Sequence, residues 1–314
     1  MYSFLLILLT LYCSSSKGEQ TNTCIVIFTK KKVPNFWGYA YQKNSPSNRM
    51  IDVDSRLILK SLKEVLDDPL RKITLTTTVK EVLKVIESKD IVSLGEISKS
   101  TIGILASKYS ISDSKELGYL RYFIGNVYRY KIVSLGYKWV DMSAHKDDYL
   151  DHYKGKRILI RRIINRQDRI MAMITNEDFV NKKDLYSFKI TDDRFVPEYI
   201  LALINSKLFS FIYVNSSSIS TKDDFRQTTL SELRRLPVAL ADLKTQMHIT
   251  DIVREIINLY ASMPDGNRRN FTDKEDLKLA KIKNLEQLID SEIYKIYGIN
   301  EDHISEIEER YPNL

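Results

Sequence analysis

Glycine and cysteine are scarce in this chain of 314 residues, and each scarcity excludes a class of protein. With 10 glycines, the chain has few of the turns whose bare backbone cradles a nucleotide phosphate, and no G-x-x-x-x-G-K-S/T string occurs. A fold that binds a nucleotide cofactor is therefore disfavoured. The two cysteines, Cys13 and Cys24, have no spacing that suits a tetrahedral zinc site or a disulfide framework.

Catalytic motifs are missing as well. The sequence contains no G-x-S-x-G turn, no H-E-x-x-H pair and no Asn/Asp-Pro-Pro-aromatic loop, which amino-methylating enzymes use to grip a flipped base. The four histidines are scattered, and we expect each to be solvated or satisfied internally: His145, His152, His248 and His303. We therefore predict no catalytic residues, no metal site and no cofactor in this chain.

The apolar run Phe4–Tyr12 is about half as long as a membrane-spanning helix, so we expect no membrane contact. As a signal peptide it lacks a positive charge before it and a small-residue cleavage site after it. We favour a buried core element whose upstream partner is not in this sequence, and hence a cytoplasmic protein. An exported or membrane-anchored binding protein is the alternative.

What is present is the composition of a globular protein of about two domains, with 43% hydrophobic and 28% charged residues. Lys and Arg number 48 against 41 Asp and Glu, which gives a net charge of +7 and a pI near 9.0. This balance permits a polyanionic partner such as nucleic acid but does not establish one.

Hydrophobic periodicity predicts both strands and helices. Thr23–Lys32 is typical of a buried strand, and Arg56–Leu66 and Val79–Ile86 have the spacing of amphipathic helices. A domain boundary is expected near Lys89. In Leu120–Trp139, aromatic and cationic residues, including Arg129, alternate on short strands, which fits either a half-buried sheet or a surface for a nucleic-acid backbone.

The segment Tyr153–Ala172 is the sharpest local signal. It contains seven cations and one acid, Asp168, and its isoleucines are spaced as in a strand that turns arginines to the opposite face. Arginine suits bidentate contact with phosphate or with guanine, so we predict that part of this cluster binds DNA; the alternative is an exposed basic strand that binds nothing. The seven cations are Lys154, Lys156, Arg157, Arg161, Arg162, Arg166 and Arg169.

Helices dominate the rest of the chain. Phe195–Ser217 predicts a buried helix interrupted by Asn205, Ser206 and Lys207, either as a solvated break or as a polar cluster turned toward a partner. Asp242–Met263 and Asp273–Tyr297 predict an antiparallel helical hairpin.

A metal-dependent nuclease is a further alternative, because Asp265, Asp276 and Lys278 have the spacing of two carboxylates and a lysine around an activated water. They lie in a polar linker and at a helix start, where a metal would lack rigid support, so we interpret the spacing as coincidence.

The stretch Lys154–Pro237 resembles the TaqI-like C-terminal specificity domain, the target-recognition part of adenine-specific DNA methyltransferases and of type IIG restriction-modification enzymes. The motifs that carry the resemblance are Leu120–Tyr130, Lys156–Arg162, Asp184–Ile190, Tyr199–Leu208, Phe225-Arg226 and Leu233–Val238. Gly18–Lys32 is similar to the last catalytic-domain strand of such enzymes, and Leu285–Ile307 to their closing helix.

The resemblance implies a mixed α+β chain: a remnant of a methyltransferase sheet edge in 1–44, a helical linker in 45–89, a target-recognition domain in 90–240 and a C-terminal helical region in 241–314. It implies double-stranded DNA as partner, a missing catalytic half as a candidate separate chain, and S-adenosylmethionine as cofactor of the complete enzyme only. Besides the basic cluster, Arg129, Asn205, Ser206 and Lys207 are expected near the DNA.

Overall fold

The computed structural model describes residues 35–39, 57–61, 63, 77–133, 136–164, 169–216, 227–264 and 272–311, with the side chains of Lys63 and of residues from 81 onward. The chain divides into two compact units, Met1–Lys80 and Glu81–Leu314. The predicted elements Phe4–Tyr12 and Thr23–Lys32 lie outside the described residues, and the expected domain boundaries stay predictions.

The first unit contains a pair of antiparallel strands. Strand β1 (Asn35–Tyr39) pairs with β2 (Leu57–Ser61) in a register that sets Asn35 opposite Ser61. The helix predicted for Arg56–Leu66 is therefore wrong, because residues 57–61 of that segment form a strand. Pairing with a distant, aromatic-rich strand outweighs local helical spacing, because a short apolar run suits either state until its partner decides.

Helix α2 (Thr77–Glu87) confirms the prediction for Val79–Ile86. Val82 and Ile86 are four residues apart, share one face of the helix and are fully buried. A carboxylate oxygen of Glu81 and Nε2 of His303 lie 2.9 Å apart in a hydrogen bond, which links α2 to helix α9 (Glu301–Arg310).

An antiparallel sheet of four strands forms the centre of the second unit, in the order β11-β10-β13-β4. Leu159 and Leu185 pack on one face with Phe123, Val127 and Phe179. The opposite face, which carries Ile158 and Ile160, is buried where helix α4 contacts β10 and β11. The strands are β4 (Ser98–Ile102), β10 (Arg157–Arg161), β11 (Ala172–Thr175) and β13 (Leu185–Ile190).

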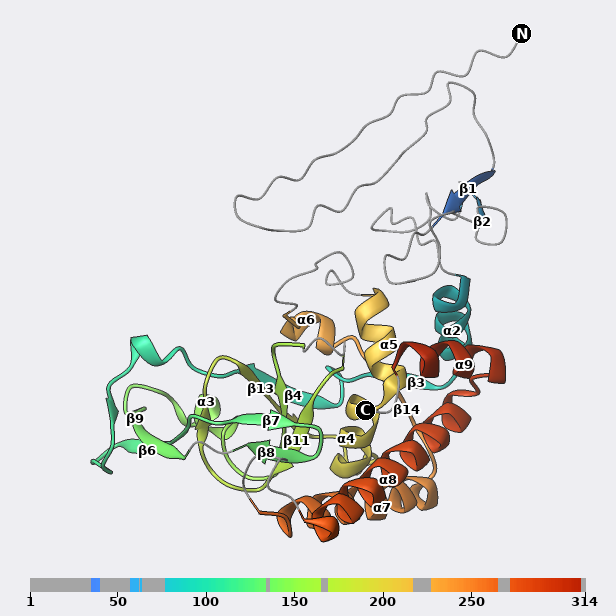
Figure 1. Ribbon diagram of the computed structural model, residues 1–314. Helices are drawn as coiled ribbons and strands as arrows, with labels where there is room; N and C mark the ends of the chain where they lie inside the picture. The colour runs from blue at the N-terminus through green and yellow to red at the C-terminus, as the bar shows by residue number, and fades with distance from the viewer. Residues whose placement is uncertain are drawn as a thin grey trace, which may run out of the picture. The chain divides into compact units, whose positions relative to one another are not determined.

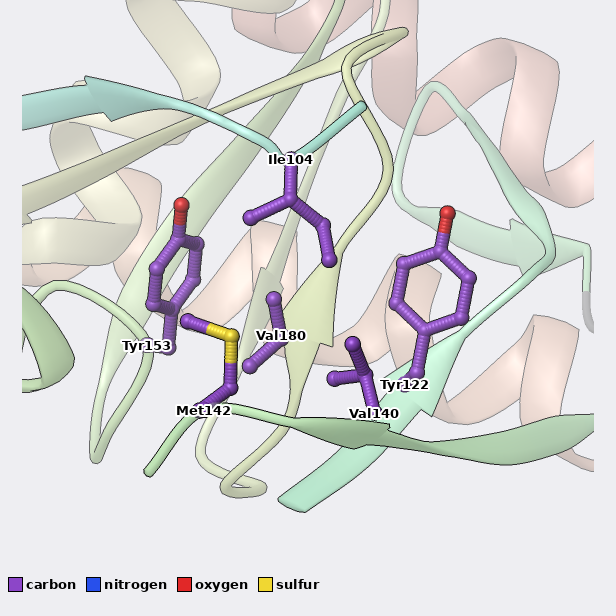
Figure 2. Close-up of a cluster of buried hydrophobic side chains, with 6 residues drawn as sticks. All are labelled: Ile104, Tyr122, Val140, Met142, Tyr153 and Val180. Atoms are coloured by element: carbon purple, nitrogen blue, oxygen red, sulfur yellow. The ribbon is translucent and has the colours of Figure 1, made fainter. Parts of the chain in front are cut away.

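A second sheet and two short strand pairs complete the β structure, and the strands predicted in Leu120–Trp139 are confirmed. The sheet has the order β12-β6-β9-β5, and Tyr122 and Val140 project from it toward Tyr153 and Ile104 in a buried cluster (Figure 2). The strands are β3 (Ile91–Ser93), β5 (Ile111–Ser112), β6 (Tyr119–Phe123), β7 (Asn126–Tyr128), β8 (Lys131–Val133), β9 (Tyr137–Asp141), β12 (Val180–Asn181) and β14 (Pro237–Ala239), with β7 paired to β8 and β14 to β3.

The helix predicted for Phe195–Ser217 consists of two helices, α4 (Pro197–Asn205) and α5 (Lys207–Ser216). Ser206 between them has extended backbone, with ψ near 157°. The break is at the predicted place but is buried rather than solvated, since at most 2% of each of Asn205, Ser206 and Lys207 is exposed.

The C-terminal helices α7 (Leu243–Ala261) and α8 (Asp273–Tyr297) pack against each other as the predicted hairpin, and α9 (Glu301–Arg310) follows. Figure 1 shows α4 and α5 between the central sheet and these helices. Shorter elements are η2 (Ala106–Lys108), α3 (Asp147–Asp151) and α6 (Leu230–Leu233).

The predicted mixed α+β class is confirmed, because the second unit contains both sheets and helices and α4 packs against strands β10 and β11. Within the described ranges, no helix is both long enough and apolar enough to cross a membrane.

Candidate nucleic-acid interface

Strand β10 divides the predicted basic cluster into two groups, one at each end of the strand. Lys154 and Lys156 precede the strand, whereas Arg161 ends it and Arg162 follows it, about 17 Å away at the usual rise of an extended chain. The strand between them is buried on both faces except at Arg161. The single exposed ribbon expected from the sequence therefore does not form, because a central strand covered on both sides has no solvent face.

Arg157 lies inside the fold, which argues against the DNA contact predicted for it. Its side chain is 1% exposed and donates to the carbonyl oxygens of Gly155, Glu177 and Phe179 at 3.0, 2.6 and 2.8 Å. The guanidinium also lies 4.5 Å from the ring centre of Phe179. Burial lowers the pKa of Arg157 to about 10, so the carbonyls stabilise a cation that has lost its water.

Arg169 and Asn205 are also internal. Arg169 is 8% exposed and donates to the carbonyl of Asn205 at 2.5 Å. The Asn205 amide accepts from the backbone N–H of Ala172 at 2.8 Å and donates to its carbonyl at 3.0 Å. Asn205 thus completes the edge of strand β11 as a neighbouring strand would, which explains why a polar residue is buried there.

Ser206 and Lys207 join helices rather than facing a partner. The Ser206 hydroxyl donates to the carbonyl of Leu203 and accepts from the N–H of Phe209. The Lys207 ammonium is paired with Glu308 of α9, and its backbone N–H donates to Asp290 of α8 at 2.8 Å. The polar cluster is therefore an internal joint between α4, α5 and the C-terminal helices.

Arg129 forms a bidentate ion pair with Glu286 of α8. Its Nε and Nη2 each lie 3.0 Å from a carboxylate oxygen, and about a fifth of each side chain is exposed. Both donors that face Glu286 are occupied, so the predicted DNA contact by Arg129 has no support from the geometry.

The beginning of β10 is surrounded by acids. Lys156 forms a 2.7 Å ion pair with the buried Glu198, and Arg254 lies 3.6 Å from the same carboxylate. Asp178 accepts from the N–H of Gly155 at 2.7 Å, so a carboxylate lies beside Lys154, which is exposed. This end of the strand is less suited to a polyanion than the composition of the cluster indicates.

The other end of β10 is where arginine meets solvent. Arg161 is half-buried; its guanidinium lies 5.8 Å from the ring centre of Tyr128, which is 48% exposed. Arg162 is half-buried too, and within the described part of the chain neither arginine has an ion-pair partner. Nη1 of Arg161 lies 3.8 Å from the sulfur of Met171, so an anion would compete there with a weak neutral acceptor and not with a carboxylate of the described residues.

Further polar and basic residues gather at this end. The N–H of Arg162 donates to the carbonyl of Asp184 at 2.8 Å, which places the exposed Lys183 close by, together with Asp184, whose carboxylate lies 3.7 Å from the ammonium of Lys182. Ile163 forms an isolated bridge with Gln227, whose side chain is exposed. Lys183 was not predicted as a site residue, although the Lys182-Lys183 pair precedes a strand; Tyr128 belongs to Leu120–Trp139, for which a nucleic-acid surface was one of the two interpretations. The predicted contact Arg166 and the resemblance motif Phe225-Arg226 lie outside the described residues.

The described residues do not form the metal site that the nuclease alternative requires. Asp276 is exposed in the first turns of α8, and Lys278 donates to the carbonyl of Ser262 at 2.8 Å. Asp265 lies outside the described residues. Among the residues that the structure places, no group of three or more His, Cys, Asp or Glu side chains could hold a metal ion.

Residues 120–238 match the family model of the TaqI-like C-terminal specificity domain, so the predicted resemblance is confirmed and includes the aromatic strands as well as the basic segment. The chain is also 36% identical over 291 residues to "Putative type II restriction enzyme and methyltransferase RM.MjaORFECS2P" of Methanocaldococcus jannaschii. That match covers 89% of this chain and 24% of the relative, so the chain spans about a quarter of the relative's length.

Solved structures of restriction-modification proteins have a partial likeness to this fold. The type IIL restriction-modification enzyme MmeI in complex with DNA has a TM-score of 0.41 at 13% identity, over 62% of this chain and 31% of that one. The type IIG restriction endonuclease BpuSI has a TM-score of 0.42 at 12% identity, over 77% and 36%. Scores of this size indicate only limited architectural agreement.

Proposed function

We propose that this chain recognises a specific sequence in double-stranded DNA, as the target-recognition portion of an adenine-specific DNA methyltransferase of a restriction-modification system. The observation that carries the proposal is the match of residues 120–238 to a specificity domain. Its physical support is the end of β10, where the half-buried Arg161 and Arg162 form no ion pair with the described residues.

The chemistry of this end suits a duplex. A guanidinium presents a planar fork of donors that matches two phosphate oxygens, or the O6 and N7 acceptors of guanine in the major groove. The exposed ring of Tyr128 beside Arg161 adds a flat surface for a sugar or a base edge. We assign the main DNA contacts to Arg161 and Arg162, with Arg166 as a predicted neighbour and Lys154 as a peripheral phosphate contact.

Recognition and methylation are divided in this proposal. The relative of which the chain covers a quarter is named both as a restriction enzyme and as a methyltransferase, whereas this sequence has no Asn-Pro-Pro-aromatic loop. The chain would therefore bind DNA without catalysing a reaction, and base flipping and methyl transfer from S-adenosylmethionine would occur on a catalytic half. We place this function in the cytoplasm.

The test is fluorescence-anisotropy binding of the full chain to a labelled 30-base-pair duplex pool with a randomised centre, over a series of salt concentrations. Replacing Arg161 or Arg162 by Gln should lower the slope of log affinity against log salt by about one for each lost phosphate contact. Lys244→Gln is the matched control, because Lys244 is exposed on α7 and its loss changes the net charge equally.

Two results would overturn the proposal. If the wild-type chain does not bind the pool at low salt, DNA recognition itself is wrong. If it binds but the two arginine variants have the slope of the Lys244 variant and select the same sequences from the pool, the interface lies elsewhere.

A further inference from the structure

The turn between β7 and β8 has an unusual backbone for its sequence. Arg129 and Tyr130 form this two-residue turn, and Tyr130 has a φ of 57°, in the left-handed region that non-glycine residues seldom adopt. Tyr130 is 2% exposed, and its backbone N–H donates to the carbonyl of Ala172 at 3.0 Å. The strained turn therefore depends on surrounding structure to hold it.

Helix α8 supplies that structure through the ion pair between Arg129 and Glu286. Two parallel hydrogen bonds of 3.0 Å set the orientation of the arginine as well as its distance. About four fifths of both side chains is shielded from solvent, so the pair is screened less than a surface pair would be. The turn is consequently tied to an element more than 150 residues later in the chain.

The strand that precedes the turn carries the exposed ring of the proposed interface. Val127 is fully buried in the core with Leu159, and the next residue, Tyr128, faces outward beside Arg161. Because side chains alternate along a strand, a shift of one residue at the turn would exchange these two positions. The location of the Tyr128 ring thus depends on the turn that Glu286 holds.

We propose that Arg129 and Glu286 are positioning residues for DNA sequence recognition: their ion pair holds the β7–β8 turn so that Tyr128 and Arg161 meet the duplex in one geometry. This inference rests on the proposed function. It assigns a role in specificity to α8, a helix for which the sequence indicates only packing.

Glu286 distinguishes positioning from direct contact. If Arg129 bound DNA directly, removing the carboxylate that competes for it would strengthen binding of every duplex. If the pair positions the turn, removing the carboxylate weakens binding of the preferred sequence and leaves nonspecific phosphate binding unchanged. The two explanations therefore predict opposite signs for one substitution.

The experiment compares Glu286→Gln with Glu255→Gln in the full chain. Glu255 on α7 forms a 2.6 Å ion pair with Lys281 of α8, so its variant has the same charge change and also loses a pair between elements. The probes are the duplex that the wild type enriches most from the randomised pool and a scrambled duplex of equal composition. We expect the affinity ratio of the two duplexes to fall about tenfold in Glu286→Gln only, with an unchanged salt slope.

Amide hydrogen exchange and a double variant with the two charges swapped complete the test. Amides of residues 126–133 should exchange at least tenfold faster in Glu286→Gln, whereas those of β10 and β13 should not change. The double variant Arg129→Glu with Glu286→Arg should recover part of the affinity ratio. A gain in affinity for both duplexes, or unchanged exchange in residues 126–133, would overturn the inference. A wild-type chain that enriches no sequence would instead overturn the proposed function and the inference with it.

Discussion

At the scale of single residues, arginines that are close in sequence have opposite environments. Arg157 donates three hydrogen bonds to carbonyl oxygens inside the fold, whereas Arg161, four residues later, reaches solvent beside Tyr128. A buried guanidinium needs several acceptors to replace its water, and those acceptors are then no longer free for a ligand. The role of a cation in this chain is therefore decided by its acceptors rather than by its residue type.

Asp290 is the buried carboxylate of the joint between α5 and α8. Asp290 belongs to α8 and is 4% exposed. Its carboxylate accepts a hydrogen bond from the backbone N–H of Lys207 at the N-terminus of α5. Burial raises the pKa of Asp290 to about 6, while Arg169 and the Lys207 N–H act in the opposite direction. An aspartate at its ordinary pKa of 3.8 loses its proton earlier, so the folded state holds more protons between pH 4 and 6.

The stability of the folded chain should therefore decrease through this group as pH rises from about 4 to about 6. The free energy of unfolding of the wild type minus that of Asp290→Asn should fall by up to about 3 kcal/mol over this window and stay constant above it. Urea denaturation at several pH values measures the difference.

Asp151→Asn is the control with the opposite sign. Its hydrogen bond to Lys189 lowers the pKa of Asp151, so the advantage of the wild type over that variant should grow as pH rises. A difference between wild type and Asp290→Asn that is flat or rises between pH 4 and 6 would contradict the interpretation of Asp290.

At the scale of elements, close backbone packing supports the end of the sheet that carries the proposed interface. Gly103 follows β4, and its N–H donates to the carbonyl of Leu185 at 3.0 Å. A Cβ atom at this position would lie 2.1 Å from the carbonyl oxygen of Lys182 and 2.3 Å from that of Asn181. Backbone atoms cannot move aside as a flexible side chain can, so glycine is required there.

Gly103→Ala should consequently destabilise the chain by about 3 kcal/mol, as measured by urea denaturation. Gly155→Ala separates this clash from backbone strain, because Gly155 has a φ of +64° but an added Cβ would meet nothing within 4 Å. We expect a cost of about 1 kcal/mol for the control. Equal costs for both variants would show that β4 and the β12–β13 connection are not tightly packed in solution.

At the scale of the second unit, polar contacts link elements that are far apart in the sequence. Arg129 reaches α8, Lys207 reaches α9, and Asn205 connects α4 to the edge of β11. A resemblance to a DNA-binding family made these residues candidates for contacts with DNA. In the structure they stabilise the arrangement of helices and strands instead.

Removing Lys207 tests this larger connection. Lys207→Met leaves Glu308 without its buried partner and should destabilise the chain by about 2–4 kcal/mol, with faster hydrogen exchange in α9. Lys189→Met is the matched control, since the pair between Lys189 and Asp151 is partly exposed and should contribute less than about 1 kcal/mol. Similar losses in the two variants would show that the joint at Lys207 has no special stabilising role.

Much of the fold could be predicted from local pattern. The hairpin of α7 and α8, the strands around Tyr122 and Trp139, and the interruption at Ser206 follow from hydrophobic spacing and turn residues, which are properties of short segments. Strand β2 could not be predicted, because its state depends on pairing with β1, whose residues lie about twenty positions away.

The sequence by itself determined the mixed α+β class, the excess of positive charge and the likeness to a specificity domain, because these reside in composition, periodicity and motif order. Only the tertiary structure decided which cations remain available. Arg157 is buried because both faces of β10 are covered. Arg129 and Lys207 form ion pairs with helices α8 and α9. Arg161 and Arg162 lie at the end of the strand, where they are only half-buried. Burial depends on what packs against a residue from elsewhere in the chain, and no local pattern contains that information.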